Sequence, residues 1–460
     1  MSTKTQSAPP QENKMGTMPV NRLLLTMSIP MMLSMLVQAL YNIVDSVFVS
    51  MISENALTAV SLTFPIQNLM IAVAIGLGVG VNALLSRSLG EKQFEKVHRA
   101  ASNGLFLELI GVAIFILIGI FGTGPFFRSQ TSDTEILEYG YQYMSIVCIL
   151  SFGLFMQCTF ERLLQSTGKT IYTMITQGTG AIINIIMDPI LIFGLFGFPK
   201  LGVAGAALAT CLGQFVAAFL AMYLNHKKNL EVRVRIRGFR PEWVIIREIF
   251  VVGIPSIIMQ AIGSVMTYGM NLILISFNST ATAVFGVYFK LNSFIFMPVF
   301  GLNNGMVPIV AYNYGARRKD RMMKTLKLSL CYAVGLLTVG LVLFQTFPAF
   351  FLSLFNASET MTAIGVPALR IISISFPFAA VGIVCGSLFQ SLGNGIYSLI
   401  ISVLRQLVVL LPSAYLLSLT GRLDLVWWSF IIAEVFSFAV SLFFLRRIYK
   451  QVIAPIGEAR

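Results

Sequence analysis

The chain has 460 residues, of which 56% are hydrophobic and 11% are charged, and its formal net charge is +13. A soluble domain carries roughly 25% charged residues, so this composition excludes an ordinary soluble protein. Stretches such as 249–289 and 328–356 contain no Asp, Glu, Lys or Arg, and a membrane-spanning helix needs about 20 apolar residues. The composition therefore predicts an all-α polytopic membrane protein.

In chain order, the sequence predicts a polar N-terminal tail, two sets of six membrane-spanning helices joined by a basic linker, and a C-terminal tail. Residues 1–19 have no apolar core with a cleavage site, so we expect a flexible cytoplasmic tail and an uncleaved first span. The first six spans, which form an N-lobe over 20–225, are expected at 20–50, 56–85, 97–124, 139–160, 169–196 and 202–225. After the linker 226–245, a C-lobe over 246–445 is expected to contain spans at 246–276, 281–310, 326–353, 362–390, 395–419 and 424–445, followed by the tail 446–460.

Basic residues gather in alternate loops of this predicted topology. They follow the second, sixth and eighth spans and comprise Arg87, Lys92, Lys96, Arg99, Lys227, Lys228, Arg233, Arg235, Arg237, Arg240, Arg317, Arg318, Lys319 and Arg321. Loops rich in Lys and Arg remain in the cytoplasm, so both termini are expected there. This distribution explains the positive charge by orientation and contact with anionic lipid, and it argues against a nucleic-acid partner.

The chain also contains an internal duplication with a constant offset of 225 residues. "QSTGKTIY" at 165–172 meets "QSLGNGIY" at 390–397, and further pairs keep the same offset: Pro30 with Pro255, Gly76 with Gly301, Gly80 with Gly305, and Gly90 with Gly315. Each copy has an even number of spans, so the copies should be related by a pseudo-two-fold axis along the membrane normal. Transporters built this way bind substrate between their halves, although channels can also be duplicated.

Two carboxylates within the predicted spans differ between the copies. Asp45 and Asp188 lie in the first copy, whereas the second copy has Met270 and Ser413 at the matching positions. A charged residue at a helix centre costs about 2.5–3.5 kcal/mol on insertion scales, so such a residue is a functional candidate. A scaffold role would require acids in both copies.

Helical spacing places further polar groups near these acids. Gln38, Tyr41 and Asp45 follow i, i+3, i+7, and Asn184 with Asp188 follows i, i+4, so each set shares one helix face. The other polar groups that we single out are Tyr143, Gln157, Glu161 and Thr210. Two carboxylates with Asn and Thr oxygens suit a hard monovalent cation, and close carboxylates can equally share a proton. The sequence leaves sodium and proton both open.

Residues 18–450 resemble the multidrug and toxic compound extrusion (MATE) transporters, nearest the MepA/DinF-like branch. The resemblance rests on twelve spans in two pseudo-symmetric lobes and on "YNIVDSVFVS" (41–50), "ERLLQSTGK" (161–169), "NIIMDP" (184–189) and "GVAGAALAT" (202–210). It implies export of bulky cationic or aromatic drugs by antiport with a proton or sodium ion, in a bacterial inner membrane. We expect the chain to function as a monomer, with no cofactor apart from the coupling ion.

The resemblance also implies two sets of site residues. The cation site would comprise Asp45, Asn184, Asp188 and Thr210, and the adjoining drug chamber would be lined by Gln38, Tyr41, Tyr143, Gln157 and Glu161. Glu161 occupies a position where relatives often carry Asn. Another branch of the family has acids within spans seven and ten. Here span seven has only Glu248, at its cytoplasmic edge, and span ten has none, so we expect coupling in the N-lobe. Lys290, Arg370 and Arg405 are candidate counter-charges or gating residues of the C-lobe, or side chains that snorkel to the interface.

Three other classes of protein are alternatives to a drug exporter. A lipid-linked oligosaccharide flippase of the same fold would prefer a cationic chamber. The basic residues of the C-lobe argue for this alternative, and the acids of the N-lobe argue against it. An enzyme is not expected, because the only histidines, His98 and His226, lie in loops and no phosphate-binding loop or metal-ligand spacing is present. A channel or an inert scaffold would not explain acids confined to one half of a duplication.

Overall fold

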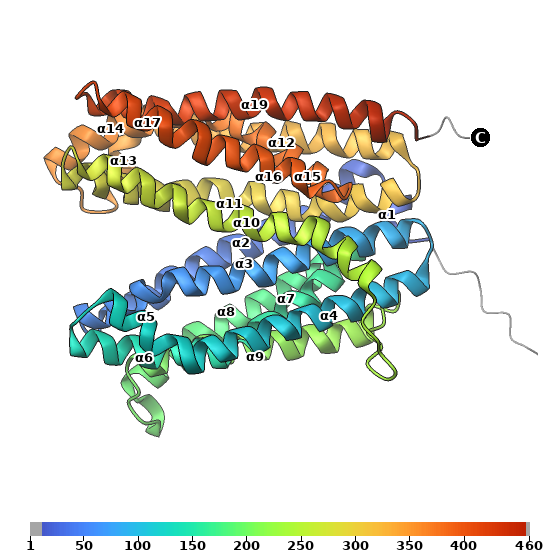
Figure 1. Ribbon diagram of the computed structural model, residues 1–460, viewed down its shortest axis with the longest axis horizontal. Helices are drawn as coiled ribbons and strands as arrows, with labels where there is room; N and C mark the ends of the chain where they lie inside the picture. Colours follow the sequence, from blue (N-terminus) through green and yellow to red (C-terminus); the bar gives the residue numbers. More distant parts are fainter. Residues whose placement is uncertain (1–11, 457–460) are drawn as a thin grey trace, which may run out of the picture.

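The computed structural model describes residues 12–456, and within this range the regular secondary structure is helical. The first half contains α1 (Lys14–Thr17), α2 (Val20–Ser50), α3 (Glu54–Gly90), α4 (Phe94–Leu117), η1 (Ile118–Gly122), α5 (Thr123–Gln130), α6 (Thr134–Ile149), α7 (Phe152–Ser166), α8 (Thr170–Phe193), η2 (Leu195–Gly197) and α9 (Val203–Lys228). The second half contains α10 (Trp243–Ile275), α11 (Ser279–Gly315), α12 (Lys319–Thr346), α13 (Pro348–Ser353), α14 (Glu359–Ser373), α15 (Phe376–Ser391), α16 (Gly395–Val403), η3 (Leu404–Leu410), α17 (Leu411–Ser418), α18 (Leu423–Val426), α19 (Trp428–Ile448) and η4 (Tyr449–Ile453). Figure 1 shows two stacked bundles of long helices.

The twelve predicted spans are confirmed, and two of them are bent. Ten helices in the described range are long and apolar enough to cross a membrane, and there are twelve spans if each bent pair counts as one. The α6–α7 pair bends by 42° and the α14–α15 pair by 50°. The two breaks fall at Leu150–Ser151 and Ile374–Ser375, near-equivalent positions of the duplication. Pro377 in the first turn of α15 has no N–H to donate, which favours the second break.

Glycines of the two lobes allow their central helices to approach closely, and they do so symmetrically. Helix α3 packs on α10, and α11 packs on α2. A Cβ added at Gly76 would overlap Ile257, and one added at Gly301 would overlap Met32. These two contacts are equivalent, because the 225-residue offset relates Gly76 to Gly301 and Met32 to Ile257. Gly90 contacts Tyr312, and Gly315 contacts Arg87. Each residue of the first contact lies 225 positions from its counterpart in the second, so these two contacts are also equivalent. The repeated glycines of the sequence are therefore sites of backbone contact between the lobes.

Residues 12–19, which we expected to belong to a flexible tail, are instead built into the contact between the lobes; residues 1–11 and 457–460 of the predicted tails lie outside the described range. Met15 is fully buried. Its carbonyl oxygen accepts hydrogen bonds from Asn313 Nδ2 (3.1 Å) and Arg321 Nη2 (2.9 Å), and Arg318 pairs with Glu12. These partners belong to the C-lobe side, on α11, α12 and the turn between them.

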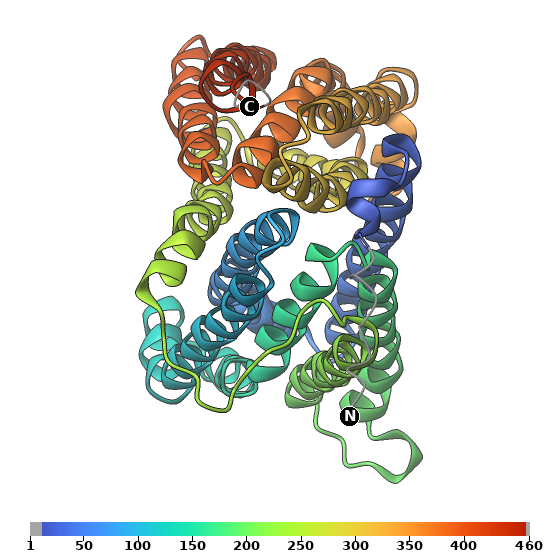
Figure 2. The same cartoon turned by 90° about the vertical axis from the view of Figure 1, so that its right-hand side faces the viewer.

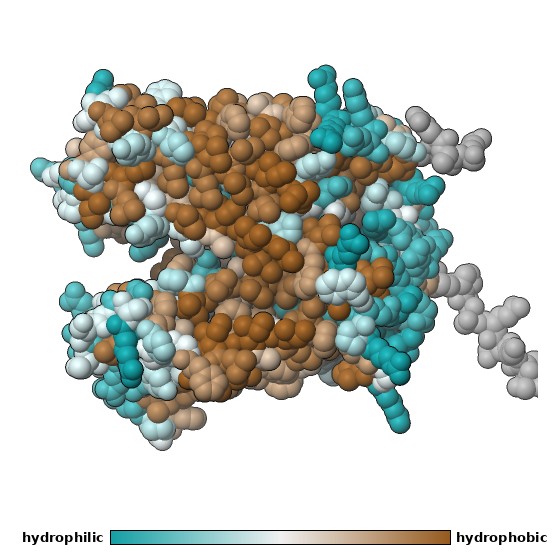
Figure 3. Space-filling model, viewed as in Figure 1, coloured by the Kyte–Doolittle hydropathy of each residue, from teal (hydrophilic) through white to brown (hydrophobic). Residues whose placement is uncertain are grey.

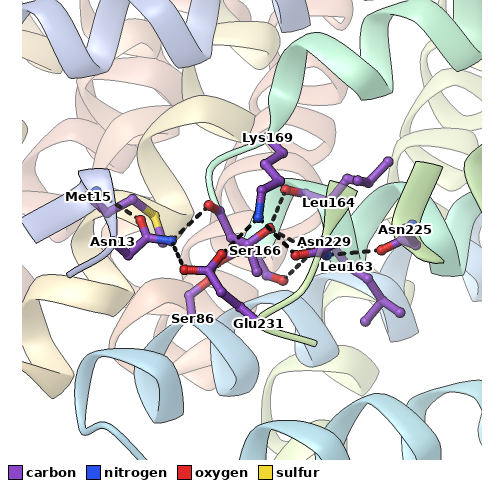
Figure 4. A network of polar contacts seen from close by, with 11 residues as sticks. Asn13, Met15, Ser86, Leu163, Leu164, Ser166, Lys169, Asn225, Asn229 and Glu231 are labelled. Carbon is purple, nitrogen blue, oxygen red and sulfur yellow. Dashed lines mark hydrogen bonds and ion pairs between the residues drawn. The ribbon is translucent and has the colours of Figure 1, made fainter. Parts of the chain in front are cut away.

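The other side of this segment is fixed to the N-lobe, as Figure 4 shows. Asn13 Nδ2 donates to the Thr167 carbonyl oxygen (3.1 Å) and to Glu231 Oε1 (2.7 Å). Glu231 is held in turn by Lys169, at 2.8 Å, and Lys169 also donates to Asn229 (3.2 Å). Burial and the nearby Lys169 charge lower the pKa of Lys14 below its usual value. We call residues 12–18 the N-terminal clasp because they bind both lobes.

The predicted linker 226–245 runs across the end of the N-lobe that also carries the clasp (Figure 2). Its backbone N–H groups are held by α4: Arg235 N donates to Ser102 Oγ (2.9 Å), and Glu242 N donates to Asn103 Oδ1 (2.9 Å). An ion pair joins Lys96 to Glu248 across the lobes at 2.9 Å. We call this end of the molecule the basic end, because the clusters of Lys and Arg lie here.

The surface of the molecule agrees with a membrane setting. Figure 3 shows a hydrophobic belt across the middle of both bundles, with hydrophilic atoms at the two ends. The same view shows a cleft between the lobes at the end opposite the basic end. The lobes are therefore joined at the basic end and separated at the other.

Candidate functional site

The acids predicted from the sequence meet in the N-lobe. Asp45 on α2 and Asp188 on α8 lie close enough for their carboxyl groups to interact. Asp188 is fully buried, and neither of its carboxylate oxygens has a hydrogen-bond donor in the described part of the chain; Asp45 Oδ1 has none either. Buried polar atoms are rarely left unpaired. Two facing carboxyl groups without donors therefore form a place for a positively charged ion or a shared proton.

Two further oxygen-bearing residues complete this arrangement. Asn184 lies one turn before Asp188 on α8, and its Nδ2 donates to Thr210 Oγ1 on α9 at 3.2 Å. Because the amide nitrogen is held by Thr210, Asn184 Oδ1 remains without a donor while buried. Carboxylate and amide oxygens are ligands for hard cations. The four residues predicted for the cation site are thus in one neighbourhood.

A small cavity lies beside this group in the N-lobe. Its volume is about 120 Å³, and its lining includes Gln38, Tyr41, Gln157, Glu161, Asn184 and Thr210. Tyr143, which we predicted for the chamber lining, does not line it: the side chain is buried on α6, and its hydroxyl accepts from Gln67 Nε2 at 3.3 Å. Sites for drug-sized ligands usually measure about 300–1,000 Å³. In this conformation the N-lobe cavity is too small for a bulky drug.

Glu161 is the acid that lines the N-lobe cavity, and both of its carboxylate oxygens accept hydrogen bonds. Thr176 Oγ1 (2.8 Å) and Gln157 Nε2 (3.0 Å) donate to Oε1, and Gln177 Nε2 (2.8 Å) donates to Oε2. The bonds from Thr176 and Gln177 tie α7 to α8. Glu161 therefore contributes a satisfied negative group to the lining, in contrast to the unpaired oxygens of Asp188.

A larger cavity lies between the lobes. Its volume is about 490 Å³, which falls within the usual range for drug-sized ligands. It shares Met35, Ile75, Arg162 and Asn304 with the N-lobe cavity. Its lining mixes apolar side chains with amides and hydroxyls, and its two charged lining residues are Arg162 and Arg405. This central cavity is the place where a bulky substrate fits.

A third cavity, of about 300 Å³, lies inside the C-lobe and is rich in aromatic rings. Arg405 and Glu434 both line it, and their ion pair measures 2.9 Å. Arg405 thus lies opposite the negative charge of Glu434. Lys290 and Arg370 are exposed, and neither forms an ion pair with a described residue.

Three charged residues that are buried or partly buried were missing from the predicted site. Glu108 on α4 is fully buried with both carboxylate oxygens unpaired, Glu434 pairs with Arg405, and Arg162 lies in the wall between the N-lobe and central cavities. The signal for the two acids was present, because both lie in apolar stretches, "FLELIGV" and "FIIAEVF". Arg162 follows Glu161 directly in the sequence, but the predicted chamber lining included only Glu161. In the described residues, no cluster of three or more His, Cys, Asp or Glu could hold a metal ion.

Comparisons with known proteins agree on the family and on the duplication. The MatE family model matches residues 30–190 and again residues 255–416, so the two matches begin 225 residues apart. The multidrug export protein MepA of Staphylococcus haemolyticus is 28% identical over 417 residues, which cover 90% of this chain and 91% of the relative. MepA of Staphylococcus aureus (strain MRSA252) is 26% identical over 417 residues, with the same coverage.

Two solved structures share the whole fold. One is the outward-facing conformation of a multidrug resistance MATE family transporter of the MOP superfamily; it is 26% identical, with a TM-score of 0.90, and the match covers 98% of this chain and 100% of that chain. The other is a MOP superfamily transporter from Pyrococcus furiosus, for which a reverse polarity of the binding pocket is said to suggest a different function. It is also 26% identical, with a TM-score of 0.90 and coverage of 98% and 99%.

Proposed function

This chain belongs to the MatE family of multidrug efflux transporters, and we propose that it is an antiporter that exports bulky cationic or aromatic compounds in exchange for protons or sodium ions. It works as a carrier rather than an enzyme, in a bacterial cytoplasmic membrane, and as a monomer. The basic end, where the described range begins and ends, faces the cytoplasm, in line with the positive-inside rule.

The observation that carries this proposal is the pair of facing carboxyl groups, Asp45 and Asp188, whose oxygens lack donors. A proton shared between them, or a sodium ion held with the help of Asn184 Oδ1, removes the repulsion between two like charges. The pair joins α2 to α8, and α2 also packs on α11 of the C-lobe. Filling or emptying the site therefore changes a contact on the helix that links the lobes.

The arrangement of the lobes supports alternating access with the outward-open state described. The lobes touch at the basic end and leave a cleft at the opposite end (Figure 3), and a solved relative of the same fold is outward-facing. In this state a coupling ion reaches the N-lobe from outside and displaces the drug. The N-lobe cavity of about 120 Å³ is too small for the drug, so the drug binds in the central cavity and the ion in the N-lobe.

A flippase for lipid-linked oligosaccharides or related lipids is the second candidate. The charged residues that line the central cavity are both arginines, which suits a phosphate-bearing lipid better than a cation. The Pyrococcus furiosus relative is described in terms of a different function. The N-lobe acids oppose this candidate, because a lipid phosphate gains nothing from them.

Transport by purified protein in liposomes tests the proposal. Ethidium export is followed while an inward gradient of protons, or separately of sodium ions, is imposed on wild type, Asp45→Asn and Asp188→Asn. We expect one gradient to drive export and each substitution to abolish it. Glu138→Gln, which removes an exposed carboxylate of the same lobe, serves as the control and should export normally. Export that persists in both Asp variants would remove the acids from coupling, and transport of a fluorescent lipid alone would favour the flippase.

A further inference from the structure

Arg162 is a buried cation at the point where the two lobes meet. Its exposed fraction is 8%, and it lines both the N-lobe cavity and the central cavity. Gly78 on α3 makes room for it, because a Cβ there would lie 2.8 Å from Arg162 Cγ. The guanidinium is thus fixed in the wall of the central cavity.

The hydrogen bonds of Arg162 leave most of its donors free. Nη1 donates to Gln165 Oε1 (3.0 Å) and to Asn304 Oδ1 on the C-lobe (3.2 Å), both of which are neutral. Nε and Nη2 donate no hydrogen bond to any described residue, and no described carboxylate oxygen lies within 4.0 Å. A buried charge is costly unless it is paired. A planar guanidinium with two free donor groups is suited to binding a carboxylate or phosphate.

The nearby acids lie close enough to act on the charge of Arg162, but neither forms an ion pair or a hydrogen bond with it. Glu161 receives its hydrogen bonds from Thr176, Gln157 and Gln177, and both oxygens of Glu108 are buried without a donor. The other arginine of the cavity, Arg405, differs because it forms an ion pair with Glu434 at 2.9 Å. Among the described residues, Arg162 is therefore the charged residue of the central cavity that has no direct carboxylate partner.

A second side chain in the cavity wall also lacks partners. Asn303 is 5% exposed, and neither its Nδ2 nor its Oδ1 has a hydrogen-bond partner among the described residues. It lies next to Asn304, which holds Arg162, and it lines the same cavity. A buried amide left without partners in a native structure calls for an explanation, and a polar ligand group in the cavity provides one.

We propose that Arg162, with Asn303, forms an anion subsite of the central cavity that binds the carboxylate or phosphate of an amphipathic ligand. Such ligands include aromatic drugs that carry a carboxylate and phosphate-bearing lipids. The subsite extends the proposed substrate range from cationic compounds to zwitterionic and anionic ones. It rests on the proposed function only in taking the central cavity as the substrate chamber, and its equilibrium test needs no ion gradient.

Two dyes that differ by one carboxylate test the subsite. Rhodamine B carries a free carboxylate, and its ethyl ester does not. Binding of both to the full chain in phosphatidylcholine nanodiscs is followed by fluorescence polarisation for wild type, Arg162→Gln and Arg162→Lys. Hydrogen bonds to a charged group are worth about 1.5–3 kcal/mol, so Arg162→Gln should weaken rhodamine B binding roughly 10-fold or more while the ester binds as before. Arg162→Lys keeps the positive charge but lacks the planar set of guanidinium donors, so it should lose less affinity for rhodamine B than Arg162→Gln does.

The outcomes separate the subsite from a purely structural role and from a failure of the proposed function. If Arg162 only joins the lobes, Arg162→Gln weakens both dyes equally and the proposal is overturned. A wild type that binds both dyes equally also overturns it, whether or not the variants fold. Repeating the titration with phosphatidylglycerol nanodiscs identifies the anion source: competition by this lipid in wild type, absent in Arg162→Gln, assigns the subsite to a lipid phosphate. Ion-coupled export that fails while the dye preference persists would refute coupling and leave the subsite intact.

Discussion

Asp188→Asn should stabilise the protein and remove its response to the coupling ion. Asp188 is fully buried, its carboxylate oxygens lack donors, and it faces Asp45. Two unit charges about 4 Å apart interact with about 4 kcal/mol at an effective dielectric constant near 20, which is an upper limit here because Asp45 is only partly buried. The amide has the same shape, carries no charge and can donate to Asp45. We therefore expect a gain of about 1–3 kcal/mol in sodium-free buffer at pH 9, where repulsion is greatest.

The assay is thermal unfolding of detergent-purified protein followed by tryptophan fluorescence. Wild type should gain stability when the coupling ion is added, either by lowering the pH or by adding sodium, and a ligand at 100 times its Kd contributes about 2.7 kcal/mol. Asp188→Asn should start at a higher melting temperature and respond far less. Glu138→Gln should behave as wild type in both respects. An Asp188→Asn protein with the melting temperature and ion response of wild type would refute the reasoning.

The remaining predictions concern the contacts between and within the lobes. Met15→Asp should break the N-terminal clasp, because the fully buried Met15 side chain would be replaced by a charge, and distances between spin labels across the basic end should lengthen and broaden. Gly80→Val should overlap α10 and cost about 1–3 kcal/mol, whereas Gly178→Ala, which meets no atom within 4 Å, should leave stability and export unchanged. Arg405→Met should cost about 1–3 kcal/mol by leaving the partly buried Glu434 unpaired, and the double variant with Glu434→Leu should recover most of this loss in chemical denaturation.

Each of these predictions has a contrary result. Unchanged label distances in Met15→Asp would mean that the clasp does not hold the lobes. Equal effects of the two glycine substitutions would point to helix propensity rather than lobe contact. Additive losses in the Arg405 and Glu434 double-mutant cycle would show that the ion pair contributes no coupling energy.

The membrane spans could be predicted because lipid imposes strong rules on sequence. Every predicted span matches a helix or a bent pair of helices, since uncharged stretches of this length have few other stable structures. The duplication could be detected because Gly76 and Gly301, and the other glycine pairs, occupy equivalent contacts between the lobes. Asp45 and Asp188 were identifiable because an acid in an apolar span is rare.

Other features depend on packing that sequence does not specify. Helical spacing places Tyr143 on α6, but the rotation of that helix turns its hydroxyl to Gln67 and away from the cavity. Arg162 stands near the end of a predicted span, where an arginine usually reaches the interface, and only the fold shows that it faces the central cavity. The clasp was missed because it is a short segment whose partners are more than 150 positions away, as with Asn13 and Thr167.

The N-terminal clasp has a consequence for the order in which the chain is assembled. Asn13 binds Glu231, 218 residues later, and Met15 binds Arg321, 306 residues later. At about 5–20 residues per second, a ribosome needs roughly 15–60 s to add the 306 residues that separate this last pair. The clasp is therefore translated long before its partners, and it docks on both sides only when both lobes are present. A half-made or wrongly inserted chain therefore leaves Asn13 and Met15 without the partners that hold them in the finished fold.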